Sequence, residues 1–81
     1  MARTLLALTN AWQLVSTKIC TITLQEYRKG TILINETEDD ITALRVNGEA
    51  GVQIAQTEAK NTYVRLRDGV PLGSKIVIDE V

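Results

Sequence analysis

The chain carries few side chains that could perform catalysis. Ser16, Ser74 and Cys20 are possible nucleophiles, but the 81 residues include no His that could act as a general base for them. The five glycines do not form a phosphate-binding loop between a strand and a helix. We therefore expect a protein that is not an enzyme and that uses no cofactor.

Residues 36–40 (ETEDD) are the densest group of possible metal ligands. Carboxylates at alternate positions suit Ca²⁺, but the run lacks the Gly and the distal Glu of a helix-loop-helix calcium site. A solvated loop is therefore the main interpretation, and a cation site is the alternative. With one Cys and no His, the chain has no internal disulfide and no ligand set for structural zinc.

Arginine and aromatic side chains are the other conspicuous group. Trp12 is most typical of a core residue, although it is one of only three aromatic residues and is also a candidate anchor for a subunit contact. Tyr63, Arg65 and Arg67 alternate along one face of a predicted strand, which we expect to point outward. Because Tyr and Arg are enriched at binding hot spots, this face is either an interface or an ordinary solvated strand face.

These side chains require β-strands to position them. Thr, Ile and Val make up 25 of the 81 residues, and β-branched residues pack well on a pleated sheet. Short stretches of alternating polarity, separated by turn signals such as Asn47-Gly48 and Asp68-Gly69, predict about eight strands. The predicted strands are residues 4–8, 11–15, 18–25, 31–35, 41–46, 52–54, 62–67 and 74–80.

The pattern predicts an all-β chain with a single domain over residues 1–81. We expect a compact antiparallel β-sandwich or jelly roll of 7–8 short strands. Residues 18–25 and 31–35 are expected to form a hairpin, and the alternation within 18–25 places Cys20 in the core beside Ile22 and Leu24. A helix over residues 49–60 is disfavoured by Gly51 and by β-branched residues.

Size and charge indicate how such a domain would work. The net charge of −1, with Lys and Arg scattered among the acids, argues against nucleic-acid binding. No apolar run has the length of a membrane span or a signal peptide, so we expect no membrane partner and synthesis in a cytoplasm. A small β-domain without disulfide or metal is marginally stable alone, which favours assembly with copies of itself.

The N-terminal residues are the predicted means of assembly. Residues 4–8 are apolar and uncharged, so an edge strand formed by them would be open to pairing with another chain. We expect residues 1–9 to form an extended arm that pairs with a neighbour, with Leu5 and Leu6 at the contact.

The order of several motifs resembles small virion proteins of tailed bacteriophages. The motifs are AWQLV, TILIN after a Gly, ITALRVNGEA, and TYVRLR before a terminal strand that ends in Glu. The residues that carry the resemblance are Trp12, Asn35, Leu44, Arg45, Gly48, Glu49, Tyr63 and Arg65. The chain departs from the pattern at residues 36–40, where ETEDD replaces a middle rich in Gly, Ala and Pro.

This resemblance implies a β-sandwich that decorates or cements a capsid, usually as a homotrimer. The expected partners are copies of the chain and the major capsid protein or another virion protein, and the expected location is the virion, assembled in the host cytoplasm. Two alternatives stay open: a tail, fibre or head-completion component, and a small module that binds a ligand or carbohydrate.

Overall fold

The alternating segments form eight β-strands, and none of the residues placed by the structure is helical. The structure is a computed structural model that describes residues 2–26, 31–47, 52–69 and 72–81. The strands are β1 (Ala2–Ala7), β2 (Gln13–Ser16), β3 (Cys20–Glu26), β4 (Ile32–Asn35), β5 (Leu44–Val46), β6 (Gln53–Gln56), β7 (Thr62–Leu66) and β8 (Lys75–Glu80). The predicted all-β fold is confirmed.

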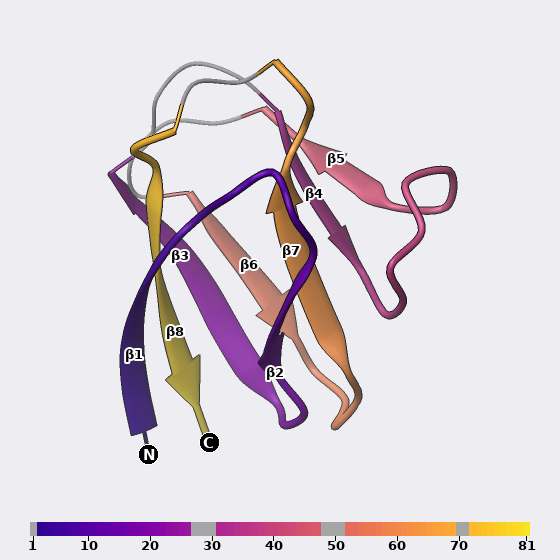
Figure 1. The fold of residues 1–81 in the computed structure, drawn as a ribbon. Helices are drawn as coiled ribbons and strands as arrows, with labels where there is room; N and C mark the ends of the chain where they lie inside the picture. The colour runs from indigo at the N-terminus through magenta and orange to yellow at the C-terminus, as the bar shows by residue number, and fades with distance from the viewer. Residues whose placement is uncertain (1, 27–30, 48–51, 70–71) are drawn as a thin grey trace.

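The strands form two antiparallel four-stranded sheets (Figure 1). The first sheet has the order β1-β8-β3-β6, and the second has the order β2-β7-β4-β5. β1 pairs with β8, β2 with β7, β3 with β6 and β4 with β5, as in a long hairpin that has been rolled up. This is the strand arrangement of a jelly roll, and it places the N- and C-terminal strands side by side.

The core lies between the two sheets and is built from alternate residues of each strand. Cys20, Ile22 and Leu24 of β3 are all buried, as their alternation predicts, and they belong to one cluster with side chains from both sheets. The other buried members of this cluster are Leu8, Ile32, Ile34, Val64, Leu66, Ile76 and Ile78. The inward positions of the strands therefore follow from the period-two pattern of the sequence.

Polar side chains connect the sheets at the edge of this core. The buried Ser16 hydroxyl of β2 donates a hydrogen bond of 2.6 Å to the Glu80 carboxylate of β8. At the neighbouring strands, the Gln56 amide donates to the Thr62 hydroxyl over 3.3 Å. Because a buried polar group without a partner is costly, these bonds allow Ser16 and Thr62 to be buried.

The turn predicted at Asp68-Gly69 is present. Gly69 has a φ of +88°, a conformation that glycine adopts without the steric cost of a Cβ atom. At the other predicted turn, Asn47-Gly48, the glycine lies outside the described residues.

The predicted hairpin between residues 18–25 and 31–35 is wrong. β3 pairs with β8 and β6 in the first sheet, whereas β4 pairs with β7 and β5 in the second. Both strands carry apolar side chains at alternate positions, and placing them in opposite sheets lets their inward rows face each other across the core. Alternation predicts the buried face of a strand but does not identify its neighbour.

Residues 2–7 of the expected N-terminal arm form a strand of the domain itself, and the expected pairing with a neighbouring chain stays a prediction. Residues 2–7 pair along their whole length with β8 of the same chain, from Ala2 opposite Glu80 to Ala7 opposite Lys75. Leu6 packs against the core cluster and Leu8 is part of it, so burial of these two side chains holds β1 on its own domain. Leu6 is therefore a core contact, whereas Leu5 faces solvent.

Substituting Ile76 by Ala tests the position of the core. Ile76 is fully buried on the central strand β8, so we expect a loss of about 2–5 kcal/mol in the free energy of unfolding, measured by urea denaturation. Leu14→Ala, at a half-exposed leucine of β2, is the control and should change stability by no more than about 0.5 kcal/mol. Equal effects of the two substitutions would contradict the assignment.

Cys20 predicts a pH dependence of stability. Burial raises the pKa of its thiol above the ordinary value of 9.0, the Glu80 charge raises it further, and a hydrogen bond with Ser16 acts in the opposite direction. Because the folded-state pKa is the higher one, the unfolded chain loses the thiol proton first. The stabilising contribution is therefore complete below the unfolded-state pKa and is lost as pH rises through the folded-state pKa.

The measurement compares the natural chain with Cys20→Ala, which lacks this titration. The difference in unfolding free energy between them should narrow as the pH rises above 9.0, the ordinary pKa of the thiol. A constant difference over this range would show that Cys20 ionises alike in the folded and unfolded chains.

Candidate functional site

Arg65 is the centre of a polar cluster that joins three separate segments of the chain. Its position on β7 directs the side chain to the outer face of the second sheet. There the guanidinium donates several hydrogen bonds. It donates to both oxygens of Asp40 at 3.1 Å, to the Leu66 carbonyl oxygen at 3.1 Å, and to the Asp68 carboxylate. The Arg65 side chain is only 10% exposed as a result.

Trp12 joins the same cluster from the segment before β2. Its indole N–H donates a hydrogen bond of 3.0 Å to Asp40, and the Arg65 guanidinium lies 5.9 Å from the centre of its ring. A guanidinium over an indole face is attracted by the negative potential of the ring. The aromatic ring, the cation and the carboxylate thus hold one another in a fixed arrangement, which we call the Arg65 cluster and define as Trp12, Asp40, Arg65 and Asp68.

The prediction that Arg65 lies on an open, outward-facing stripe is therefore wrong in one respect. Residues 63, 65 and 67 do face away from the core, but Arg65 is buried while Tyr63 is half-buried and Arg67 is exposed. The segment that carries Asp40 covers Arg65, because the carboxylate offers two acceptors that match the guanidinium. Of the predicted stripe, Tyr63 and Arg67 retain surface that is open to a partner.

The acidic run at residues 36–40 is an exposed loop in which several carboxylates bind other parts of the domain. Glu36 forms an ion pair of 2.7 Å with Lys60. The Asp39 carboxylate accepts hydrogen bonds from the Ile41 backbone N–H and the Thr42 hydroxyl. Since Asp40 binds Arg65, these carboxylates already have protein partners, and no group of three or more Asp, Glu or Cys side chains in the described residues is arranged to hold a metal ion.

Of the side chains that bind Arg65, only that of Asp68 lies in its local sequence. Asp68 is three residues away, but Asp40 is 25 residues away and Trp12 lies in the segment between β1 and β2. The acidic run was recognisable as a cluster of carboxylates, yet its pairing with Arg65 depends on how β4, β5 and β7 lie side by side.

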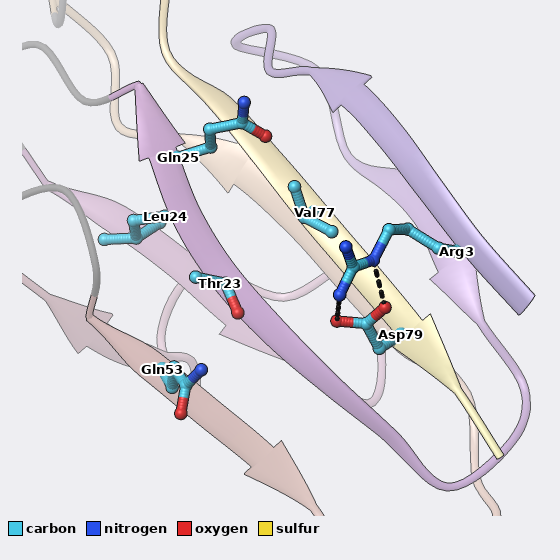
Figure 2. Close-up of a pocket in the computed structure, with 7 residues that line it drawn as sticks. All are labelled: Arg3, Thr23, Leu24, Gln25, Gln53, Val77 and Asp79. Atoms are coloured by element: carbon cyan, nitrogen blue, oxygen red, sulfur yellow. Dashed lines mark hydrogen bonds and ion pairs between the residues drawn. The ribbon is translucent and has the colours of Figure 1, made fainter. Parts of the chain in front are cut away.

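The outer face of the first sheet is a second candidate site. An open hollow of about 500 Å³ lies there, and its polar lining includes Thr23 and Gln25 of β3 and Gln53 of β6 (Figure 2). At one side of it, Arg3 on β1 binds Asp79 on β8, with 2.7 Å between Nε and Oδ1. The hydrogen bond and the charge of Asp79 both raise the pKa of Arg3, so the Arg3 guanidinium stays protonated at neutral pH.

This hollow has the chemistry of a binding surface. Amide and hydroxyl groups can donate and accept hydrogen bonds, and the Arg3–Asp79 pair supplies one fixed charge of each sign. Among the residues that line it there is no Ser or Cys nucleophile, and the carboxylate of Asp79 is already bound to Arg3.

The edges of the sheets are the third candidate. β1 and β6 form the edges of the first sheet, and β2 and β5 those of the second. Over the described residues, three of these four strands present a leucine that is at least half exposed: Leu5 on β1, Leu14 on β2 and Leu44 on β5. An exposed apolar side chain beside unpaired backbone groups favours pairing with another strand.

The candidate residues predicted from the sequence are thus spread over the molecule rather than gathered in one place. Trp12 and Arg65 meet in the Arg65 cluster. Tyr63 lies on β7 and Arg67 directly follows that strand. Leu5 lies on β1, in the opposite sheet. None of the described residues belongs to a helix that is long and apolar enough to cross a membrane.

Replacing Asp40 by Ala tests the Arg65 cluster. The change leaves a buried guanidinium short of acceptors, and we expect a loss of about 1–3 kcal/mol in unfolding free energy. Because the chain has a single Trp, its fluorescence also reports the lost indole hydrogen bond directly. Glu38→Ala removes the same charge from an exposed position of the same loop and should leave both the stability and the emission maximum unchanged. Identical behaviour of the two variants would contradict the cluster's structural role.

A comparison of the chain with protein-family models, with curated proteins and with solved structures finds no match.

Proposed function

We propose that this chain is a structural, non-enzymatic virion protein that binds a capsid in many copies as a decoration or cement protein. The observation that carries the proposal is the exposure of Leu5, Leu14 and Leu44 on edge strands of a small domain. Such edges are a liability for a protein that works alone, whereas a protein that works in an assembly covers them.

The fold and the sequence add to this argument. Jelly rolls recur in viral capsid domains, and the eight strands of this chain have that arrangement. A fold alone does not assign a function, so the capsid as partner comes from the resemblance of the sequence motifs to small phage virion proteins. Many weak contacts, one set from each copy, would add up through avidity on a repeating surface.

The surface that would contact the shell is the outer side of the second sheet. Tyr63 is half-buried and Arg67 is exposed beside the rigid Arg65 cluster, so a partner would meet one aromatic and one cationic side chain on a fixed support. Side chains whose support is already ordered lose less conformational entropy on binding.

The proposal is tested on particles of the virus that encodes the chain. Quantitative mass spectrometry of purified particles should find the chain in numbers comparable to the major capsid protein, and electron microscopy should place it over the whole shell. Particles that lack the chain should recover it when the purified protein is added, and Arg67→Glu should weaken that recovery. A few copies at one vertex or in the tail would replace decoration by a head-completion or tail role.

A second candidate is a module that binds a small polar ligand, and the hollow of the first sheet favours it. Gln25, Gln53 and Thr23 converge there with the Arg3–Asp79 pair. The residues that line it include no aromatic ring on which a sugar would stack, which is why this function ranks second. A monomer that binds glycans on an array, and is absent from particles, would favour it over the virion role.

A further inference from the structure

We infer that the free edge of β1 pairs with the same edge of a second copy of this chain, in an antiparallel register centred on Leu5. The inference deepens the proposed assembly role, on which it rests, by naming a surface through which two copies contact each other. It proposes a two-fold pair in place of the homotrimer that the resemblance implies. In Figure 1, β1 lies at the left edge of the first sheet, with β8 on one side and, among the described residues, no strand on the other.

The hydrogen bonds of the sheet show which backbone groups of β1 are free. The Leu8 N–H donates to the Ser74 carbonyl oxygen, so in the alternating pattern of an antiparallel pair Leu6, Thr4 and Ala2 also bond toward β8. The N–H and C=O groups of the residues between them must point to the open side. These residues are Arg3, Leu5 and Ala7.

The other side of β8 leads to the same assignment. The Val81 N–H donates to the Ile19 carbonyl oxygen, so β8 bonds toward β3 through Asp79 and Val77. It must then bond toward β1 through Ile76 and Ile78, which lie opposite Leu6 and Thr4.

β1 is the edge best suited to such pairing. It has six residues and an unbroken register with β8, whereas β2 contains a register shift and β5 has only three residues. β6 has four residues. Arg3 is the one charged residue of β1, and Asp79 of the same chain already neutralises it, so the edge lacks the unpaired charge that protects many edge strands.

The sequence of β1 favours a two-fold register centred on Leu5 over one centred on Arg3. Centred on Leu5, it places Leu5 opposite Leu5 of the partner subunit and Arg3 opposite Ala7 of the partner subunit. Each of these pairs exchanges two hydrogen bonds, so all three outward-facing residues are satisfied. A register centred on Arg3 would instead set two like charges against each other, which destabilises a sheet.

The side chains on the outer face agree with this register. Leu5 is 56% exposed in the single chain and lies beside Val77 of β8. In the paired form, the two Leu5 side chains become neighbours across the two β1 strands. Together with Val77 of each copy they form a continuous row of apolar side chains on the outer face of the joined sheet. Burying this leucine surface stabilises the contact, and the first sheets of the two copies join into one continuous sheet.

The test uses the purified chain alone, so its result is separate from the particle experiment. Light scattering should give the mass of two chains for the natural protein and of one chain for Leu5→Lys, because two ammonium groups would meet at the two-fold axis. Leu14→Lys adds the same charge at a leucine of similar exposure on β2 and should remain paired. An equimolar mixture of Leu5→Lys and Leu5→Glu should recover the two-chain mass, since opposite charges then meet.

Amide hydrogen exchange identifies the edge itself. The N–H groups of Arg3, Leu5 and Ala7 should be protected in the natural chain and lose that protection in Leu5→Lys, while those of Thr4 and Leu6 stay protected in both. A monomeric natural chain, a mass of three chains, or dissociation by Leu14→Lys in place of Leu5→Lys would overturn the pairing. If the pairing is overturned in this way but the natural chain still binds particles, the proposed virion role stands.

Discussion

β8 is hydrogen-bonded on both sides, to β1 and to β3, and the rest of the structure depends on this central position. Its inward residues Ile76 and Ile78 lie in the middle of the core, and its last residue Glu80 binds Ser16 of the opposite sheet. The two ends of the chain thus meet in one sheet. The fold is complete only when the C-terminal strand has been inserted, which makes the domain rich in contacts between distant residues and predicts slow folding.

The Arg65 cluster is a second layer of order on the outside of this core. An arginine on an outward-facing strand position would ordinarily be solvated, but Asp40 and Trp12 enclose it. Leu33, which neighbours Arg65 and Arg45 in register, is only 3% exposed although it is not part of the central cluster. The aliphatic parts of arginine side chains cover apolar surface in this way, so the second sheet has some burial on both faces.

The two sheets consequently present different surfaces. The second sheet offers an outer face on which the Arg65 cluster is already paired and Arg67 is exposed. The first sheet offers an open hollow lined largely by polar side chains, and the edge of β1. A surface with fixed charges favours specific recognition of a partner, whereas an open strand edge favours backbone pairing between chains. A repeating assembly needs both kinds of contact, and this difference between the sheets is the physical basis of the proposed role.

The sequence by itself determined which residues face inward. The alternation of Cys20, Ile22 and Leu24 predicted the buried face of β3, and Asp68-Gly69 predicted a turn, because both signals are local. Its single Cys also leaves no second cysteine for an internal disulfide. These features require only the chemistry of adjacent residues.

Only the tertiary structure decided which strands are neighbours and what happens to the outward-facing side chains. β3 pairs with β8, 49 to 60 positions away, instead of forming the expected hairpin with the segment that follows it. Arg65 is buried because Asp40 reaches it from a loop between two other strands, and β1 is an edge strand of its own sheet rather than an arm. A period of two specifies the face of a strand, but its neighbours depend on contacts between distant residues that no local pattern contains.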